Sequence, residues 1–289
     1  MVMSTITCPD ISIVIPAYNA QHHIVDRLGD IMRTIRPGSN IEFLFVNDGS
    51  TDKTIIAIMT AVAALNKTGY SAIHLGTDEN RGTFEAERLG IERATGEYVF
   101  FQDVDDPINI NLIKELYDLR IAMPSNFHVT CPTRLIKPGW TEDQPPSGWI
   151  LNVWHSLKGP VISALKSQQR RGLGAISRRS LFERHIIGEV YDSLARELIE
   201  AGIDRINSMQ DAITITYMIG LGIFDSIVET AEPYLYTYQA TGAVSSNWTQ
   251  RDHDKPILMA TTDFAIDRIH GANSERRYAD YLQGIGEGT

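Results

Sequence analysis

Two hydrophobic periods alternate along the first third of the chain. Short runs of β-branched and aromatic residues, each ending at a polar segment, are typical of strands buried on both faces of a parallel sheet. Between these runs, apolar residues recur every three or four positions, as expected for helices with one buried face. The predicted strands lie at residues 11–15, 42–46, 71–75 and 98–101, and the predicted helices at residues 22–34, 55–65 and 84–94.

This alternation of strands and helices predicts an α/β fold in which helices flank a mostly parallel sheet. In such sheets, ligands bind beyond the carboxyl ends of the strands, where the polar segments that follow the strands gather. We therefore expect four polar segments to meet at one edge of the sheet. They are Tyr18–Asn19, Asp48, Asn80–Arg81 and Asp103–Asp106.

The pattern is looser after Pro107, and the predicted elements are further apart. A stretch rich in proline, glycine and tryptophan at residues 137–148 is expected to be a long loop or lid. Charged and apolar positions alternate with a helical period over about the last forty residues. The other predictions are helices at 112–121 and 211–219, a helix whose first residues are 180–184, and strands at 128–131 and 174–177.

Three carboxylates occupy four positions directly after the fourth predicted strand, at Asp103, Asp105 and Asp106. Each raises the cost of ionising the others, so the segment needs a cation or a strong donor beside it. Mg²⁺ and Mn²⁺ prefer oxygen ligands, and Mg²⁺ typically binds one or two carboxylates together with substrate phosphates. The alternative is that Asp105 or Asp106 caps a helix that begins near Pro107, although a cap needs one acid rather than three.

Composition narrows the class of protein. The 289 residues suffice for one large domain or two closely joined ones. A net charge of −10 argues against a generic nucleic-acid binder. Cys8 and Cys131 are too few and too far apart for a disulfide framework, so both are expected to be reduced. The start of the chain lacks the pattern of a secretory signal, and no run of about 18 apolar residues occurs, which predicts a cytoplasmic protein.

Four motifs follow one another along the first third of the chain: Val14–Asn19, Val46–Asp52, Asn80–Gly82 and Gly96–Asp106, the last of which contains the sequence Asp-x-Asp. In their order and spacing these motifs resemble the family-2 glycosyltransferases of the GT-A fold, a Rossmann-like α/β fold. The close resemblance covers residues 11 to about 107, and a weaker one extends to about Gly222.

The resemblance implies inverting transfer of a sugar from a nucleotide-diphospho-sugar, UDP- or GDP-linked, to an acceptor hydroxyl, with Mn²⁺ or Mg²⁺ as cofactor. It implies that Asp48 hydrogen-bonds the base, that Asp103 lies near the ribose and donor sugar, and that Asp105 binds the metal. The other donor-binding residues that it implies are Pro16, Ala17, Tyr18, Asn19, Arg81, Arg88 and Val104.

The same resemblance suggests a division of the chain into three parts. Residues 1–107 would form the nucleotide-sugar-binding half, residues 108–245 the acceptor-binding half with its lid, and residues 246–289 a C-terminal helical extension. The acceptor would be a saccharide or a lipid-linked saccharide, in surface polysaccharide or glycoconjugate synthesis. Two basic clusters, Arg170–Arg171 and Arg178–Arg179, are expected by default to be solvated surface charge; the alternative is that they bind a lipid-linked diphosphate or rest against the inner face of the plasma membrane.

Two positions depart from the family's pattern. Glu87 stands where many members have arginine, and Arg88, one residue later, points about 100° away around a helix. Gln210 precedes Asp211 where members often have two acids. Because inverting transfer needs one carboxylate to take the acceptor proton, Asp211 is the expected base. A plain helix cap is the alternative role for Asp211, and Asp204 is the alternative base.

Two other functions stay open at this point. A non-catalytic partner protein could keep the nucleotide-sugar pocket for binding alone, and Glu87 and Gln210 leave room for that. A sugar nucleotidyltransferase would be expected to have a glycine-rich basic loop after the first strand, but Pro16–Asn19 contains neither glycine nor lysine.

Several aromatic and histidine side chains are candidates for supporting roles. Tryptophan rings could stack on sugar rings, although large aromatics are usually buried in the core. Histidine could supplement a metal site, although a lone histidine is more often structural or on the surface. The candidates are Trp140, Trp149, Trp154, His155 and His253.

Overall fold

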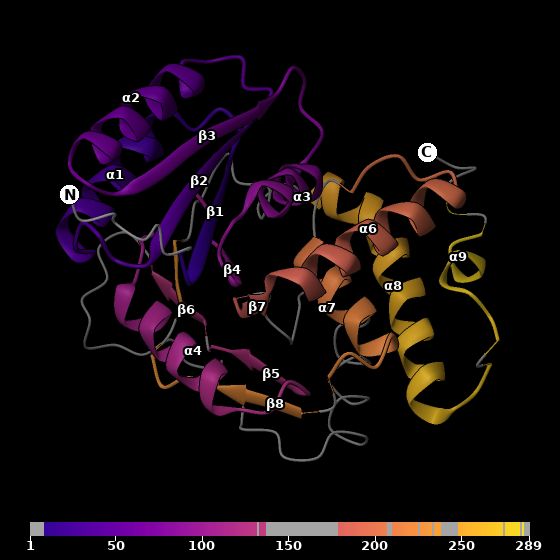
Figure 1. The fold of residues 1–289 in the computed structure, drawn as a ribbon. Coiled ribbons are helices and arrows are strands. Elements are labelled where there is room, and N and C mark those ends of the chain that lie inside the picture. The colour runs from indigo at the N-terminus through magenta and orange to yellow at the C-terminus, as the bar shows by residue number, and fades with distance from the viewer. Residues whose placement is uncertain are drawn as a thin grey trace. The chain divides into compact units, whose positions relative to one another are not determined.

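Two compact units make up the chain (Figure 1). The computed structural model describes residues 9–131, 133–136, 179–206, 210–224, 226–232, 234–237, 248–273, 275–283 and 285. The first unit comprises Met1–Arg81, Glu85–Ile110 and Leu181–Gly188, and the second comprises Gly82–Phe84, Asn111–Ser180 and Glu189–Thr289. Each unit therefore draws its residues from three separate stretches of the chain.

A five-stranded sheet, in the order β3-β2-β1-β4-β7, forms the centre of the first unit. Neighbouring strands among the first four are parallel, and the fifth strand runs antiparallel to β4. The four strands predicted from the hydrophobic runs are confirmed, each within a few residues, as β1 Ile11–Ala17, β2 Ile41–Asp48, β3 Ser71–Thr77 and β4 Tyr98–Phe101. The fifth strand, β7 Leu181–Glu183, was not predicted.

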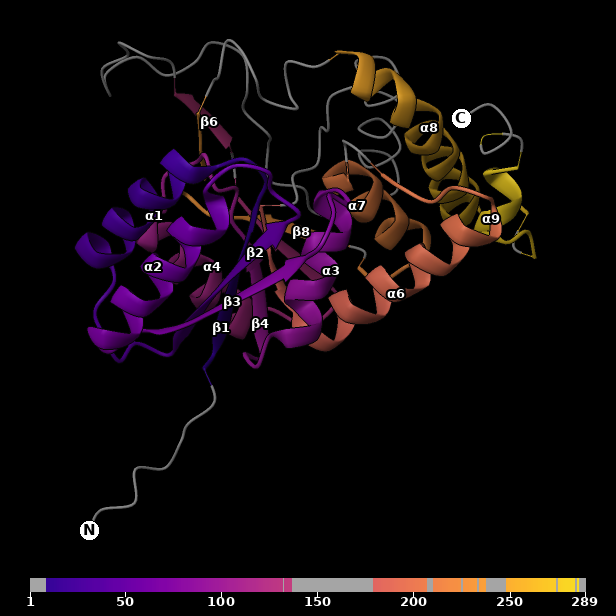
Figure 2. The same ribbon diagram turned by 90° about the horizontal axis from the view of Figure 1, so that it is seen from above.

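Helices cover both faces of this sheet. The helices α1 (Gln21–Thr34) and α2 (Thr54–Lys67) lie side by side on one face, and α3 (Thr83–Arg93) lies on the other (Figure 2). A Cβ atom added at Gly90 of α3 would lie 2.3 Å from Cγ1 of Val14 in β1, so glycine allows this helix to pack directly on the sheet. The two faces are thus closed, as the apolar runs of β1 and β2 require.

A buried carboxylate secures the amino end of the sheet. Glu42 of β2 accepts hydrogen bonds from the hydroxyl of Ser12 at 2.6 Å and from the backbone N–H of Thr95 at 2.6 Å. The N–H of Gly96 donates to the hydroxyl of Ser12 at 2.9 Å, and the carbonyl of Gly96 accepts from Nε of Arg184 at 2.7 Å. Because buried polar groups must be paired, this network fixes the turn between α3 and β4.

The prediction that residues 180–184 form the start of a helix is wrong for all but the last of them. Leu181–Glu183 is strand β7, and helix α6 (Arg184–Glu200) begins only after it. Leu181 and Phe182 are buried, and the Phe182 ring lies 5.9 Å from that of Phe101 in β4. The strand forms because β4 offers an unpaired edge and an apolar face, and neither can be read from a five-residue segment.

The second unit contains two short pairs of parallel strands and most of the remaining helices. Strand β5 pairs with β8, and β6 pairs with β9. The helices predicted at 112–121 and 211–219, the strand predicted at 128–131 and the helical C-terminal region are confirmed. The bounds are α4 Ile110–Ala122, β5 Phe127–Thr130, β6 Thr133–Ile136, α7 Gln210–Gly220, β8 Ser226–Glu229, β9 Tyr234–Thr237, α8 Trp248–His270 and α9 Tyr278–Tyr281.

Two side chains of the second unit bear on the sequence predictions. Cys131 is buried as a free thiol, and its S–H donates to the carbonyl of Arg179. Arg179 is itself buried, with its guanidinium 4.1 Å from the ring centroid of Tyr234. In the part of the chain that the structure describes, no helix is both long and apolar enough to span a bilayer.

Some predictions concern parts of the chain outside the described residues. These are the loop at 137–148, the strand at 174–177, Cys8, Trp140, Trp149, Trp154, His155, Arg170, Arg171, Arg178 and the side chain of His253.

Candidate functional site

The loops that follow β1 and β2 are joined by hydrogen bonds at the carboxyl edge of the sheet. The N–H of Asn19 donates to Oγ of Ser50 at 3.0 Å, and Oδ1 of Asn19 accepts the N–H of Thr51 at 2.9 Å. The N–H of Ala20 donates to Oγ1 of Thr54 at 2.7 Å. Asn19 has a φ of 50°, in the left-handed region that asparagine tolerates better than most residues. The two loops therefore act as one rigid platform.

Three predicted donor-binding residues lead into this platform. Pro16 and Ala17 are the last residues of β1 and pair in register with Val46 and Asn47 of β2. Ala17 is buried, whereas Tyr18 is 48% exposed. The structure thus leaves the Tyr18 ring accessible at the edge of the sheet, on a backbone that the strand pairing holds in place.

Asp48, at the end of β2, is buried beneath the loop that follows β3. Its Oδ1 accepts the backbone N–H of Arg81 at 2.7 Å and the hydroxyl of Thr77 at 3.4 Å. The structure therefore brings two of the predicted segments, at residues 48 and 80–81, into direct contact. A carboxylate that is held by a backbone N–H keeps a fixed orientation, which suits it to recognise a planar group.

The two predicted arginines, Arg81 and Arg88, are accessible to solvent, whereas Glu87, which also belongs to this stretch of the chain, is buried. The Arg81 side chain is largely exposed and pairs with Glu79 at 3.4 Å. Nε of Arg88 pairs with Glu85 on the same helix at 3.0 Å, and the Arg88 side chain is 40% exposed. Glu87 is completely buried. Helix α3 therefore turns Glu87 inward and leaves Arg88 accessible, and Arg81, which precedes the helix, is accessible as well.

The acidic segment after β4 forms a tight turn around the side chain of Gln102. The N–H of Gln102 continues the sheet by donating to the carbonyl of Val14 at 2.9 Å. Its side-chain amide donates to the carbonyls of Asp103 and Asp106, both at 3.0 Å. The N–H of Asp106 donates to the carbonyl of Asp103 at 3.2 Å. These bonds curl the backbone so that the acids project from one short turn.

The carboxylates of this turn are close enough to share a cation. One oxygen from each of Asp103, Asp105 and Asp106 can be chosen so that all three lie within 4.8 Å of one another. Asp103 and Asp105 are partly exposed, and Asp106 is fully buried. A set of hard oxygen ligands with an accessible side fits a divalent ion such as Mg²⁺ or Mn²⁺, which also keeps places for ligands from a substrate.

The alternative role of these acids, as a helix cap, is wrong. Helix α4 begins at Ile110 rather than near Pro107. Because a cap residue stands directly before the first helical residue, neither Asp105 nor Asp106 occupies that position.

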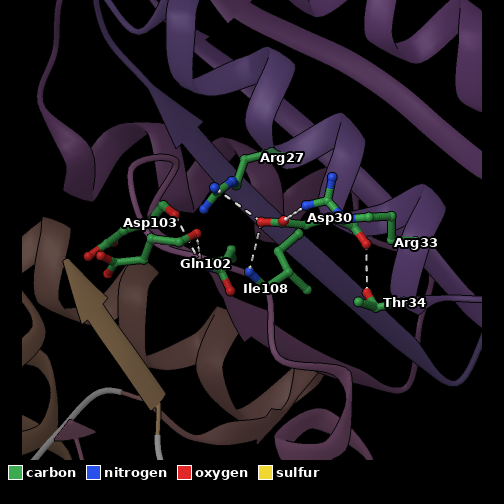
Figure 3. Close-up of polar contacts among 8 residues, drawn as sticks. Arg27, Asp30, Arg33, Thr34, Gln102, Asp103 and Ile108 are labelled. Carbon is green, nitrogen blue, oxygen red and sulfur yellow. Dashed lines mark hydrogen bonds and ion pairs between the residues drawn. The ribbon is translucent and has the colours of Figure 1, made fainter. Parts of the chain in front are cut away.

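Two residues near the acidic turn were not expected from the sequence. Arg27 and Asp30 of α1 form an ion pair at 3.1 Å, and Oδ2 of Asp30 also accepts the N–H of Ile108 at 3.3 Å (Figure 3). The signal available in the sequence is the position of Arg27, which shares the buried face of the helix with Ile24 and Ile31. A charged residue within an apolar stripe indicates a buried partner.

The predicted base and its alternative both belong to the second unit. Asp211 is half-buried in the first turn of α7, where its Oδ1 accepts the N–H of Ala212 at 2.8 Å. Asp204 is exposed in the segment between α6 and α7. A carboxylate in the first turn of a helix faces the positive end of the helix dipole.

Comparison with known proteins identifies the class. The profile of glycosyl transferase family 2 matches residues 12–186, which is more than half of the chain. The chain therefore belongs to glycosyl transferase family 2. An uncharacterized glycosyltransferase of Haemophilus influenzae is 35% identical over 109 residues, a segment that covers 37% of this chain and 41% of that protein. The matched segment thus spans less than half of that relative's length.

Solved structures share the fold over nearly the whole chain. TarS 1–349 from Staphylococcus aureus, in complex with UDP-GlcNAc, matches with a TM-score of 0.59 at 16% identity, covering 96% of this chain and 71% of that one. The mannosyltransferase PcManGT from Pyrobaculum calidifontis, in complex with GDP-Man and Mn²⁺, matches with a TM-score of 0.53 at 17% identity, covering 98% and 81%. The prediction of a GT-A fold is confirmed.

Proposed function

We propose that the protein transfers a sugar from a nucleotide-diphospho-sugar to an acceptor hydroxyl, with inversion at the anomeric carbon and with Mn²⁺ or Mg²⁺ as cofactor. One observation carries this proposal. At the carboxyl edge of the sheet, the first unit combines an oriented buried acid, Asp48, with the three carboxylates of Asp103, Asp105 and Asp106. An acid for the base and a cation site for the diphosphate are what a nucleotide-sugar donor needs.

The nucleoside would lie on the platform formed by the loops after β1 and β2. Asp48 would accept a hydrogen bond from the base, and Pro16, Ala17 and Asn19 would shape the surface beneath it. The exposed ring of Tyr18 offers a flat face for stacking. The complexes of TarS with UDP-GlcNAc and of PcManGT with GDP-Man support a UDP- or GDP-sugar as the donor.

The diphosphate would lie against the acidic turn. Asp105 would bind the cation, Asp103 would face the ribose and the donor sugar, and Val104 would contact the donor between them. A bound divalent cation would neutralise the charge that develops on the departing diphosphate. Arg81 and Arg88, both accessible, would add positive charge on the same side. The Mn²⁺ in the PcManGT complex supports the choice of metal.

Asp211 would act as the base of a single displacement. Its carboxylate would take the proton of the acceptor hydroxyl as that oxygen bonds to the anomeric carbon, and the bond from that carbon to the diphosphate would break. The products would be the glycosylated acceptor and a free nucleoside diphosphate. No covalent bond to the protein forms, so one acid suffices and Gln210 need not be acidic.

The division of labour along the chain is part of the same proposal. Residues 1–107 would bind the donor, residues 108–245 the acceptor, and residues 246–289 would extend the acceptor half with helices. The acceptor would be a saccharide or a lipid-linked saccharide used in surface polysaccharide or glycoconjugate synthesis. We propose a cytoplasmic location, with peripheral contact at the inner face of the plasma membrane when the acceptor is lipid-linked.

A donor panel tests this function without knowledge of the acceptor. Purified protein is incubated with UDP- and GDP-sugars and Mn²⁺, and the slow release of nucleoside diphosphate is followed. We expect release from one donor, loss of release in excess chelator, and recovery when Mn²⁺ or Mg²⁺ is restored. Asp105→Asn should lower the rate about 100-fold, whereas Asp26→Asn, at an exposed position on α1, should leave it unchanged. Full activity in excess chelator would exclude the role of the metal, and no release from any donor would favour a binding protein.

A further inference from the structure

The first unit contains a buried, positively charged side chain, Arg27, that the proposed reaction does not use directly. Arg27 is 6% exposed, and its Nη2 pairs with Oδ2 of Asp30 at 3.1 Å. Its Nε and Nη1 are buried and have no hydrogen-bond partner among the residues that the structure describes. A guanidinium has five N–H groups, and burial of unfilled ones costs free energy. Such a residue at a buried position calls for a compensating role.

Asp30 connects the guanidinium of Arg27 to the segment that follows the acidic turn. Its Oδ2 accepts the backbone N–H of Ile108 at 3.3 Å, next to the contact with Arg27. Its Oδ1 pairs with Arg33 at 2.6 Å, but the Arg33 side chain is 70% exposed. Oδ2 of Asp30 therefore binds both the backbone of Ile108, where the chain leaves the turn, and the guanidinium of Arg27.

The guanidinium of Arg27 also faces the start of the turn. Figure 3 shows it reaching from α1 toward Gln102 and Asp103, with Ile108 on the far side of Asp30. Gln102 is the residue whose amide binds the carbonyls of Asp103 and Asp106 and so sets the shape of the turn. The ion pair therefore binds the backbone where the chain leaves the turn, at Ile108, and its guanidinium points toward the start of the turn.

We propose that Arg27, oriented by Asp30, is a positioning residue that holds the acidic turn in the geometry that binds the divalent cation. This inference rests on the proposed metal site at Asp103, Asp105 and Asp106. Because Asp30 offsets the charge of Arg27 at contact distance, repulsion between Arg27 and the cation is reduced, and the effect of Arg27 on the shape of the turn dominates. Residues that orient the ligands of a metal act in this way without touching it.

Titration of the protein with Mn²⁺ in the absence of any nucleotide sugar tests the proposal. Free Mn²⁺ is measured by electron paramagnetic resonance, so the readout does not depend on catalysis. Arg27→Met should weaken Mn²⁺ binding about tenfold, at the low end of what loss of an orienting residue costs. Arg27→Lys, which keeps the charge and can reach Asp30, should restore most of the affinity. Arg33→Met is the matched control, since it removes the exposed partner of the same carboxylate, and it should bind Mn²⁺ like the wild type.

The double variant Arg27→Met/Asp30→Asn guards against misfolding. It removes both buried charges together, and the Asn side chain keeps an oxygen for the N–H of Ile108. We expect it to unfold near the wild-type urea midpoint. Its affinity for Mn²⁺ should lie between that of the wild type and that of Arg27→Met. Unchanged or tighter Mn²⁺ binding in this folded variant would overturn the proposed role of Arg27 but not the proposed metal site. Absence of Mn²⁺ binding by the wild type would overturn the proposed metal site and this inference with it.

Discussion

At the residue scale, Gly49 allows the loop after β2 to pack against the loop after β3. It follows Asp48 directly and has a φ of 59°, in the left-handed region that favours glycine. A Cβ atom at this position would lie 2.1 Å from the backbone carbon of Glu79 and 2.3 Å from the backbone nitrogen of Asn80. Without that close approach, the N–H of Arg81 could not reach the Asp48 carboxylate. Gly49 is therefore part of the proposed base-binding site, although it has no side chain.

Substitution Gly49→Ala should destabilise the fold and weaken nucleotide binding. The backbone of residues 79 and 80 must shift, and the alanine adopts an unfavourable φ, which together should cost about 3 kcal/mol. Urea unfolding and calorimetric titration with UDP and GDP measure the two effects. Gly38→Ala is the control, because Gly38 also has a positive φ, of 75°, but no atom within 4 Å of its Cβ position. If both variants lose the same stability, the close approach at Gly49 is unimportant.

The sequence predicts those site residues that are marked by the pattern of the residues next to them in the chain. Asp48 and the acids at 103–106 each end an apolar run, so their place at the carboxyl edge follows from the strand pattern alone. The pairing of Asp48 with the backbone of Arg81, and of Asp30 with that of Ile108, joins residues far apart in sequence. Such contacts depend on the packed fold, and no local pattern specifies them.

At the element scale, the elements marked by their own sequence pattern were predicted correctly, and those that depend on a distant partner were not. Strands β1 to β4 carry their own signal, because each is an apolar run bounded by polar residues. Strand β7 is only three residues long and exists through its antiparallel pairing with β4. Its residues taken alone suit the start of helix α6 equally well. The capping alternative placed a helix start near Pro107, before the observed start of α4 at Ile110, because the turn around Gln102 holds the backbone as far as the carbonyl of Asp106.

The short helix α9 depends on one buried aromatic residue. Tyr278 is 2% exposed, and its hydroxyl lies 2.6 Å from that of Thr261 in α8. Its ring centroid is 4.8 Å from that of Tyr217 in α7 and 5.2 Å from that of Phe264 in α8. Burial raises the pKa of Tyr278 well above its ordinary value. The phenol must therefore stay protonated for α9 to remain in place.

Stability should fall at alkaline pH through this residue. Because the pKa of Tyr278 is higher in the folded protein than in the unfolded chain, its contribution is complete below about pH 10 and is lost as the pH rises above that value. Burial raises the pKa of Tyr217 in the same direction. Tyr278→Phe should cost about 1 kcal/mol at neutral pH, from the lost hydrogen bond, and should reduce the fall. Urea midpoints at about pH 8 and about pH 11 measure this; an equal fall in both proteins would contradict it.

At the scale of the whole molecule, the proposed roles are distributed over two compact units. The donor-binding residues and the acidic turn belong to the first unit, and Asp211 belongs to the second. The family profile extends through residue 186, so it covers the proposed donor-binding residues and not Asp211. The sequence is accordingly most informative about donor recognition and least informative about the acceptor.

This distribution predicts that substitution of Asp211 separates binding from catalysis. Asp211→Asn keeps the size and the oxygen that accepts the N–H of Ala212 but cannot take a proton, so the rate of nucleoside diphosphate release should fall at least about 100-fold. Calorimetric affinity for the donor with Mn²⁺ should stay within about twofold of wild type, since the donor contacts lie in the other unit. Asp204→Asn, at an exposed position in the same unit, is the matched control and should retain full activity. A loss of activity in Asp204→Asn with normal activity in Asp211→Asn would reassign the base to Asp204, and a parallel loss of donor affinity in Asp211→Asn would place Asp211 in donor binding.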